Sequence, residues 1–168
     1  RYGSDVGFVG TFEGDRAEKM LYLARHGIRV RIWGNGWDKW KGKNSNLIIE
    51  GRSVDGEDYV KTINATKINL GFLRKINRDE TTSRSVEIPA CGGFLLAERT
   101  ERHLALFEEG KEAEFFNSSK ELLEKAKRYL ADEKSRKRIA RAGRERCLKN
   151  GYSTREQIES MFVLIRSA

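Results

Sequence analysis

The residues with the clearest chemical potential lie between positions 77 and 93, a segment that reads NRDETTSRSVEIPACGG. Hydroxyl side chains at Thr81, Thr82 and Ser83 come directly before a run with helical spacing. Free backbone N–H groups and the dipole at such a helix start favour a phosphate, and small side chains let it approach closely. Glu87 stands at least about one turn into the same helix, where a carboxylate can accept two hydrogen bonds from a vicinal diol such as a ribose. The segment therefore predicts a nucleotide site.

Strands and helices alternate along the chain, and this alternation must position that segment. Short apolar or β-branched runs predict strands at 5–10, 28–33, 47–49, 67–72, 94–97 and 113–116, with helices at 16–26, 55–64 and from 81–83 to 90. Right-handed crossovers leave few arrangements other than a parallel sheet with helices on both faces. We therefore expect an α/β fold, a Rossmann-like three-layer domain. Ligands bind such sheets at the carboxyl ends of the strands, near the point where strand order reverses.

The last third of the chain is predicted to be helical, with explicit caps. Ser118 with Glu121 and Ser153 with Glu156 both have the capping-box spacing. Asn150-Gly151 is a helix-ending pair, so we expect it to separate the last two helices.

Composition limits the classes of protein to consider. The 168 residues, at 1–168, suit one soluble domain, and no run approaches the roughly 18 apolar residues of a spanning helix. We expect a cytoplasmic protein and leave peripheral attachment to a membrane open. The formal charge of +8 suits a phosphorylated ligand, nucleic acid or an anionic membrane face. Much of it lies in 125–149, where interspersed acidic residues make a solvated helix face the favoured interpretation.

Cysteine and histidine residues show no metal-binding pattern. Cys91 and Cys147 have no metal-type spacing, and we interpret both as buried thiols. His26 and His103 are far apart and have no ligand partners at suitable spacing, so no metal site is expected.

The motif EIPACGG at Glu87–Gly93, followed by an apolar strand, resembles the C-terminal domain of GT-B glycosyltransferases of the group-1 type. The resemblance is closest to the spore-maturation CgeB-like branch and extends from FVGT at 8–11 through WGNG at 33–36 to the terminal helices. It implies the donor-binding half of a two-domain enzyme, with the N-terminal acceptor-binding domain absent from this sequence. The partner implied is a nucleotide-sugar donor, which is a substrate; no cofactor, metal ion or nucleic acid is expected, and the acceptor is unknown.

The resemblance also implies roles for individual residues. Such enzymes carry two acidic residues eight positions apart: Glu87 matches the one that holds the ribose, and Asp79 matches the one near the donor sugar, although glutamate is usual there. Two basic residues after the first strand neutralise the diphosphate in the family. Arg16 matches the second, whereas Thr11 replaces the first. We expect Asp79 and Arg16 to be catalytic, and the candidates to replace the missing cation are Arg74, Lys75 and Arg84.

Other loops after strands complete the expected donor site. Gly10 ends the first strand, and Gly34-Asn35 matches a glycine turn whose backbone passes close to the ligand. Gly51-Arg52 lies in the loop whose backbone usually meets the nucleobase. Packing in the core or on the surface is favoured over base stacking for the three tryptophans, Trp33, Trp37 and Trp40.

The reaction implied is glycosyl transfer that retains anomeric configuration and needs no metal ion, with the start of the helix near residues 81–83 and Arg16 stabilising the departing diphosphate. Two alternatives stay open. One is a non-catalytic module that binds a nucleotide or a polyanion, consistent with the +8 charge. The other is an epimerase-like nucleotide-sugar enzyme, because a fold does not determine a reaction.

Overall fold

A computed structural model of the chain describes residues 2–74 and 77–152. Within them the strands form one six-stranded sheet in the order β3-β2-β1-β4-β5-β6, and every neighbouring pair is parallel. The strands are β1 (Ser4–Val9), β2 (Val30–Trp33), β3 (Leu47–Ile49), β4 (Thr66–Gly71), β5 (Leu95–Glu98) and β6 (Glu114–Phe116). The chain order reverses between β1 and β4, which is the switch point of a doubly wound fold. The predicted α/β fold with a parallel sheet is confirmed.

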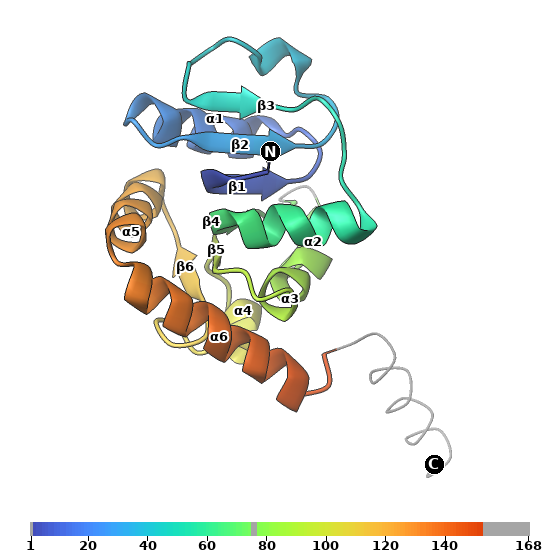
Figure 1. Cartoon of the computed structure of the whole chain (residues 1–168), viewed down its shortest axis with the longest axis vertical. Helices are drawn as coiled ribbons and strands as arrows, with labels where there is room; N and C mark the ends of the chain where they lie inside the picture. The colour runs from blue at the N-terminus through green and yellow to red at the C-terminus, as the bar shows by residue number, and fades with distance from the viewer. Residues whose placement is uncertain (1, 75–76, 153–168) are drawn as a thin grey trace.

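Helices cover both faces of the sheet (Figure 1). They are α1 (Gly14–Arg25), α2 (Gly56–Ala65), α3 (Ser83–Ala90), α4 (Glu101–Leu106), α5 (Ser119–Ala131) and α6 (Glu133–Lys149), with a 3₁₀ turn, η1 (Asp38–Trp40). Apolar residues of α1 and α5 pack in one core cluster, whereas those of α2 and α3 pack in the other.

The two cores follow from the alternation of side chains along each strand. In β1, Val6 and Phe8 face the α1 and α5 core, and Val9 faces the α2 and α3 core. In β5, Leu96 belongs to the first core and Leu95 to the second. Strands buried on both faces are typical of parallel sheets, and each fully buried aliphatic side chain contributes about 1.5–3 kcal/mol. This rigid sheet positions the loops at its carboxyl edge.

The long helix α6 runs across one end of the molecule, from below α5 to the region of α3 and α4 (Figure 1). Its Ile139 belongs to the first core and its Cys147 to the second. Gly143 lies between these two residues on α6, and a side chain at this position would overlap the carbonyl oxygen of Glu112. The helix therefore ties the two faces together.

The helical last third differs from the sequence prediction in its breaks. The first break falls at Asp132, which leaves helical geometry at φ −106° and ψ 81° and whose carboxylate accepts a hydrogen bond from the Ser135 N–H at 2.9 Å. The predicted cap at Ser118 is confirmed, because its hydroxyl accepts from the Glu121 N–H at 3.1 Å. Asn150 ends α6 as expected. The predicted cap at Ser153 and Glu156 lies outside the described residues.

The tryptophans pack in the interior, which is one of the two kinds of packing expected for them. Trp33, Trp37 and Trp40 are all buried. The Trp37 indole N–H donates to the carbonyl oxygen of Gly10 at 2.9 Å, and its ring meets Phe12 edge to face. This indole bond helps hold the loop that follows β1.

Candidate functional site

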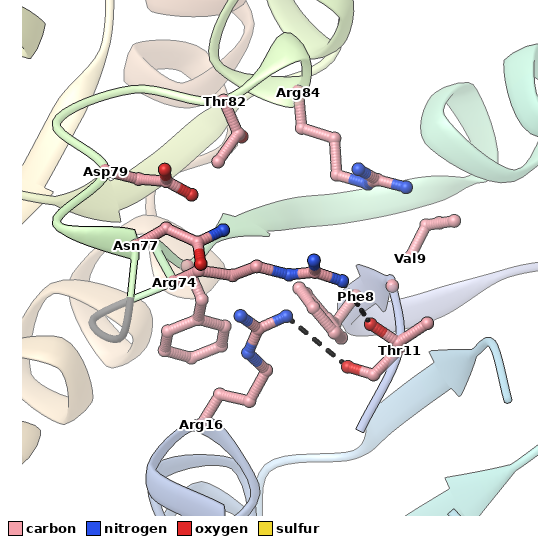
Figure 2. A pocket seen from close by; sticks show the side chains of 11 residues that line it. Phe8, Val9, Thr11, Arg16, Arg74, Asn77, Asp79, Thr82 and Arg84 are labelled. Atoms are coloured by element: carbon pink, nitrogen blue, oxygen red, sulfur yellow. Dashed lines mark hydrogen bonds between the residues drawn. The ribbon is translucent and has the colours of Figure 1, made fainter. Parts of the chain in front are cut away.

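A cavity of about 290 Å³ opens at the switch point, beside the carboxyl ends of β1 and β4. Its walls are the end of β1, the loop after β4 and the first turn of α3 (Figure 2). Three arginines contribute to an otherwise mixed lining, which consists of Phe8, Val9, Gly10, Thr11, Arg16, Phe72, Arg74, Asn77, Asp79, Thr82 and Arg84. A cationic cavity at this place in a doubly wound sheet is suited to an anionic ligand.

Arg16 forms the floor of this first cavity and is only 6% exposed. Its guanidinium donates to the carbonyl oxygens of Thr11 and Leu73, both at 3.3 Å, and pairs with the Glu13 carboxylate at 2.9 Å. Its Nε is buried and has no hydrogen-bond partner in the described part of the chain. Burial lowers the pKa of Arg16 and the Glu13 carboxylate opposes that effect, so the group stays charged.

Arg74 lies beside Arg16, and both donate to Thr11 (Figure 2). It donates to the Thr11 hydroxyl at 3.2 Å, and its Nε lies 3.3 Å from the Glu13 carboxylate. One carboxylate, Glu13, therefore holds two arginines at the edge of the cavity. Glu13 is absent from the site residues predicted from the sequence, because an acidic residue at a helix start is common in proteins without any ligand.

The third wall is the start of α3. The Thr82 N–H donates to the Ser85 hydroxyl at 3.0 Å, which secures the first turn of the helix. The Ser85 N–H donates to the carbonyl oxygen of Thr82 at 3.0 Å, whereas the N–H groups of Ser83 and Arg84 are first-turn donors that lack an acceptor inside the helix and can bind an anion. Arg84 projects from this turn, and within the described residues its buried Nε has no hydrogen-bond partner. Asp79 faces the cavity from the preceding loop (Figure 2).

A second cavity of about 470 Å³ lies between α2 and α3. Arg84 lines both cavities, so they adjoin. The remaining lining residues are Val54, Asp55, Gly56, Tyr59, Glu87, Ala90 and Cys91.

Tyr59 and Glu87 are the polar pair of this second cavity. The Tyr59 hydroxyl is buried and lacks a hydrogen-bond partner of ordinary geometry among residues 2–74 and 77–152. Burial, and then the nearby charge of Glu87, raise the pKa of Tyr59 well above its usual range. Tyr59 is absent from the site residues predicted from the sequence. No sequence signal distinguishes such a tyrosine from a core residue.

The structure brings together eight of the predicted site residues. The first cavity collects Gly10, Thr11, Arg16, Arg74, Asp79, Thr82 and Arg84, and the second collects Glu87 together with Arg84. Outside both cavities lie Thr81, Ser83, Gly34, Asn35, Gly51 and Arg52. Lys75 lies outside the described residues.

Packing accounts for Gly34. A side chain there would overlap the carbonyl oxygen of Gly10, and its N–H donates to the carbonyl oxygen of Arg52 at 2.8 Å. The Gly34 backbone thus lies close to a neighbouring loop of the protein, and its expected approach to a ligand stays a prediction. The Arg52 side chain packs beside this contact, because its guanidinium lies over the Trp33 ring, 4.8 Å from the ring centre.

Two further features concern residues 2–74 and 77–152 alone. They contain no group of three or more histidine, cysteine or acidic side chains placed to hold a metal ion, and no helix long and apolar enough to span a bilayer. Both cysteines are free thiols. Cys147 is buried as expected, and burial raises its pKa to about 11, whereas Cys91 is only half-buried at the second cavity.

The strand order defines a doubly wound α/β domain, and a polar cavity lies where that order reverses. A family model described as glycosyl transferase-like matches residues 16–162, and the chain belongs to this family. Among curated proteins, none is significantly similar to it.

Solved structures share the fold at low sequence identity. The C-terminal domain of a group 1 family glycosyl transferase from Francisella tularensis aligns with a TM-score of 0.66 and 15% identity, over 88% of this chain and 85% of that one. Sucrose-phosphate synthase from Thermosynechococcus elongatus aligns at 0.73 and 16% identity, over 96% of this chain and 44% of the synthase. Anabaena HepE, solved with UDP and glucose, aligns at 0.65 and 15% identity, over 86% and 43%. The fold is thus that of the C-terminal domain of GT-B glycosyltransferases, and the chain spans less than half of the two longer proteins.

Proposed function

We propose that this chain is the donor-binding domain of a glycosyltransferase and holds a nucleoside diphosphate sugar across the two adjoining cavities. One observation carries the proposal. Within the described residues, the buried Nε atoms of Arg16 and Arg84 have no hydrogen-bond partner and the buried Tyr59 Oη has none of ordinary geometry, and all three side chains line these cavities. Buried polar atoms in folded proteins nearly always have partners. A ligand with phosphate and hydroxyl oxygens would provide them.

The diphosphate belongs in the first cavity. Arg16, Arg74 and Arg84 supply positive charge there, and the start of α3 supplies backbone donors. The Glu13 carboxylate now balances two of these arginines. A diphosphate would compete with that carboxylate for the same guanidinium groups.

The nucleoside belongs in the second cavity, because Arg84 lines both cavities and the second therefore adjoins the diphosphate site. Glu87 is exposed on α3 and can accept hydrogen bonds from both ribose hydroxyls. The Tyr59 hydroxyl beside it can donate or accept a further bond. Anabaena HepE was solved with UDP, which makes UDP the first nucleotide to test.

The sugar would lie near Asp79, whose carboxylate can accept hydrogen bonds from sugar hydroxyls. Glycosyl transfer breaks the bond between the sugar and the diphosphate, so negative charge grows on the leaving group. Arg16 and the start of α3 would stabilise that charge without a metal ion. Retention of anomeric configuration and membership of the CgeB-like branch are part of the proposal, and they rest on the acidic pair and on the EIPACGG motif.

The acceptor site would come from a second domain, since full-length proteins of similar fold are more than twice as long as the matched region. We therefore expect the 168-residue chain to bind a donor but to transfer its sugar poorly.

The test is calorimetric titration with UDP, UMP and uridine in the presence of a chelator. We expect UDP to bind most tightly and uridine most weakly, because each phosphate adds contacts to the arginines. Arg84→Gln should weaken UDP binding roughly 10- to 100-fold, since hydrogen bonds to charged groups are worth about 1.5–3 kcal/mol. Lys39→Gln, at an exposed position on η1, is the matched control and should change nothing. Failure of UDP, GDP and ADP to bind at millimolar concentration would contradict the proposal.

A related experiment tests the alternative that the chain binds a polyanion. The strongest support for this alternative is α6, which contains eight basic and two acidic residues, with Lys134, Arg138 and Arg141 exposed. A single-stranded oligonucleotide bound through that face should lose affinity when these three residues become glutamine and should keep it in Arg84→Gln. The opposite pattern is expected for UDP.

A further inference from the structure

We propose that the corner between β5 and α4, residues 98–103, positions the phosphate-binding wall of the first cavity, and that His103 is its central positioning residue. The inference rests on the proposed function, because it assumes that a diphosphate binds at the start of α3. It concerns residues that line neither cavity.

Three side chains of this corner hold three separate segments around the cavity. The Glu98 carboxylate accepts a hydrogen bond from the Leu73 N–H at 2.8 Å, next to Arg74. The Thr100 hydroxyl donates to the carbonyl oxygen of Glu80 at 2.7 Å, in the loop that carries Asp79. His103 reaches the first turn of α3 through Ser85, at 2.7 Å. Residues 98–103 therefore contact two walls of the first cavity, which are the loop after β4 and the first turn of α3.

The partners of His103 determine which atom donates and which accepts in each of its two hydrogen bonds. Its Nδ1 lies 2.6 Å from the carbonyl oxygen of Glu98, which can only accept, so Nδ1 carries the hydrogen. In the neutral ring Nε2 is then an acceptor, and the Ser85 hydroxyl must donate to it. That hydroxyl in turn accepts from the Thr82 N–H at 3.0 Å. The result is a single chain of bonds from the start of α3 to the end of β5.

The surroundings of His103 favour the neutral ring that this chain requires. The residue is 0% exposed, and its ring stacks on Phe115 with centres 5.4 Å apart. Burial lowers the pKa of His103 below its usual value, so the ring is neutral at physiological pH. Both ring nitrogens have partners within the protein, so His103 itself has no capacity left for a ligand.

The chain of bonds has a consequence for ligand binding. Because Ser85 engages the Thr82 N–H and its own N–H donates to the carbonyl oxygen of Thr82, the N–H groups of Ser83 and Arg84 are the first-turn donors left for a phosphate. The same bond fixes the backbone that carries Arg84. Small displacements of such groups weaken binding strongly, since charge-assisted hydrogen bonds depend on distance and direction.

The experiment compares Ser85→Ala, His103→Phe and the double variant. Phenylalanine keeps a ring against Phe115 but cannot accept from Ser85. We expect each single variant to weaken UDP binding about tenfold and uridine binding less than twofold. The double variant should bind UDP about as tightly as the weaker-binding single variant, because Ser85 and His103 act through one chain of hydrogen bonds. His26→Phe, the same change at an exposed histidine of the other face, should behave as wild type.

The outcomes separate the two proposals. If wild type does not bind UDP, the proposed function fails and this inference fails with it. If wild type binds UDP and the variants lose thermal stability but keep its affinity, His103 is only a structural residue and the positioning role alone is overturned. Equal losses for UDP and uridine would overturn it as well. Should His103→Phe not fold, Ser85→Ala decides, because alanine is compatible with a helix and removes only the hydroxyl.

Discussion

Glu87 and Tyr59 meet across the groove between α2 and α3, and their environments differ. The tyrosine hydroxyl is buried, whereas the glutamate is exposed and its side chain borders open space. An exposed carboxylate contributes little to the stability of the ligand-free fold, so we expect Glu87 to matter more for ligand binding than for folding.

The first prediction is that Glu87→Gln lowers nucleotide affinity by one to two decades and leaves the ligand-free melting temperature nearly unchanged. Glutamine keeps the size but replaces a charged acceptor pair with one neutral acceptor, which costs about 1.5–3 kcal/mol in bonds to ribose. Calorimetry and thermal unfolding check both parts. Glu57→Gln, at an exposed glutamate of α2, is the control. Unchanged affinity for UDP would remove the ribose role, and a large loss of stability would make Glu87 structural.

Gly34 illustrates a residue whose role is packing at the edge of the site. Its φ is +146°, and a side chain would overlap the backbone of Gly10. The second prediction is that Gly34→Ala destabilises the protein by about 2–5 kcal/mol, through strain and overlap together. Gly27→Ala is the matched control, since Gly27 also has a positive φ, +83°, but open space around it, so only about 1–2 kcal/mol is expected. Urea unfolding measures both. Equal costs would show that overlap with Gly10 contributes nothing.

At the scale of elements, β5, β6 and α5 are joined by a network of charged groups that includes Arg99, a residue of the corner at 98–103. Arg99 pairs with Glu109 and Glu121, and Lys125 bridges Glu109 and Glu114, each at 2.6 Å. Hydrogen bonds from Arg99, despite some burial, lower the pKa of Glu121 to about 2.

The third prediction follows from that pKa. Glu121 has an ordinary pKa of 4.5 and a lower one in the fold, so its stabilisation is complete above about pH 4.5 and is lost as the pH falls towards 2. Glu121→Gln should lower the melting temperature by roughly 2–4 °C at neutral pH, equivalent to about 1 kcal/mol in a domain of this size. The gap from wild type should close below pH 4.5. Glu124→Gln, an exposed neighbour on α5, should show no such pH dependence. A gap that stays constant down to pH 2.5 would contradict the assignment.

At the scale of the whole molecule, positive charge is distributed unevenly. The net charge of the chain is +8, and α6 alone accounts for eight basic against two acidic residues. The first cavity adds three arginines beside the carboxyl ends of β1 and β4. An anionic ligand therefore approaches a protein of favourable overall charge and a cavity of favourable local charge.

The fourth prediction is that UDP binding depends on salt and uridine binding does not. Raising sodium chloride from 50 to 300 mM should weaken UDP affinity roughly fivefold, since screening acts on the charges of the diphosphate and the arginines. Uridine carries no phosphate and serves as the control. Parallel salt dependence for the two ligands would place the diphosphate away from the arginines.

Periodicity was sufficient to predict all six strands and most helices, because buried parallel strands and amphipathic helices carry strong local patterns. It failed at α4, six residues long, which is too short for a periodic signal and is stabilised by its Thr100 cap. It also failed at Asp132, since the flanking residues are good helix formers. That break is decided by α6, which must turn to cross from one core to the other.

The sequence by itself determined the order of strands and helices and the motif at residues 87–93, because both depend on residues close together in the chain. Only the tertiary structure decided which loops meet. Arg16 donates to Leu73, 57 positions away, because β1 and β4 are neighbours in the sheet. Ser85 reaches His103 because β5 brings α4 beside α3. Partners such as Glu13, Tyr59 and His103 have no local signature, since hydrogen bonds and charge pairs between distant segments depend on strand order and on the packing of helices across the sheet.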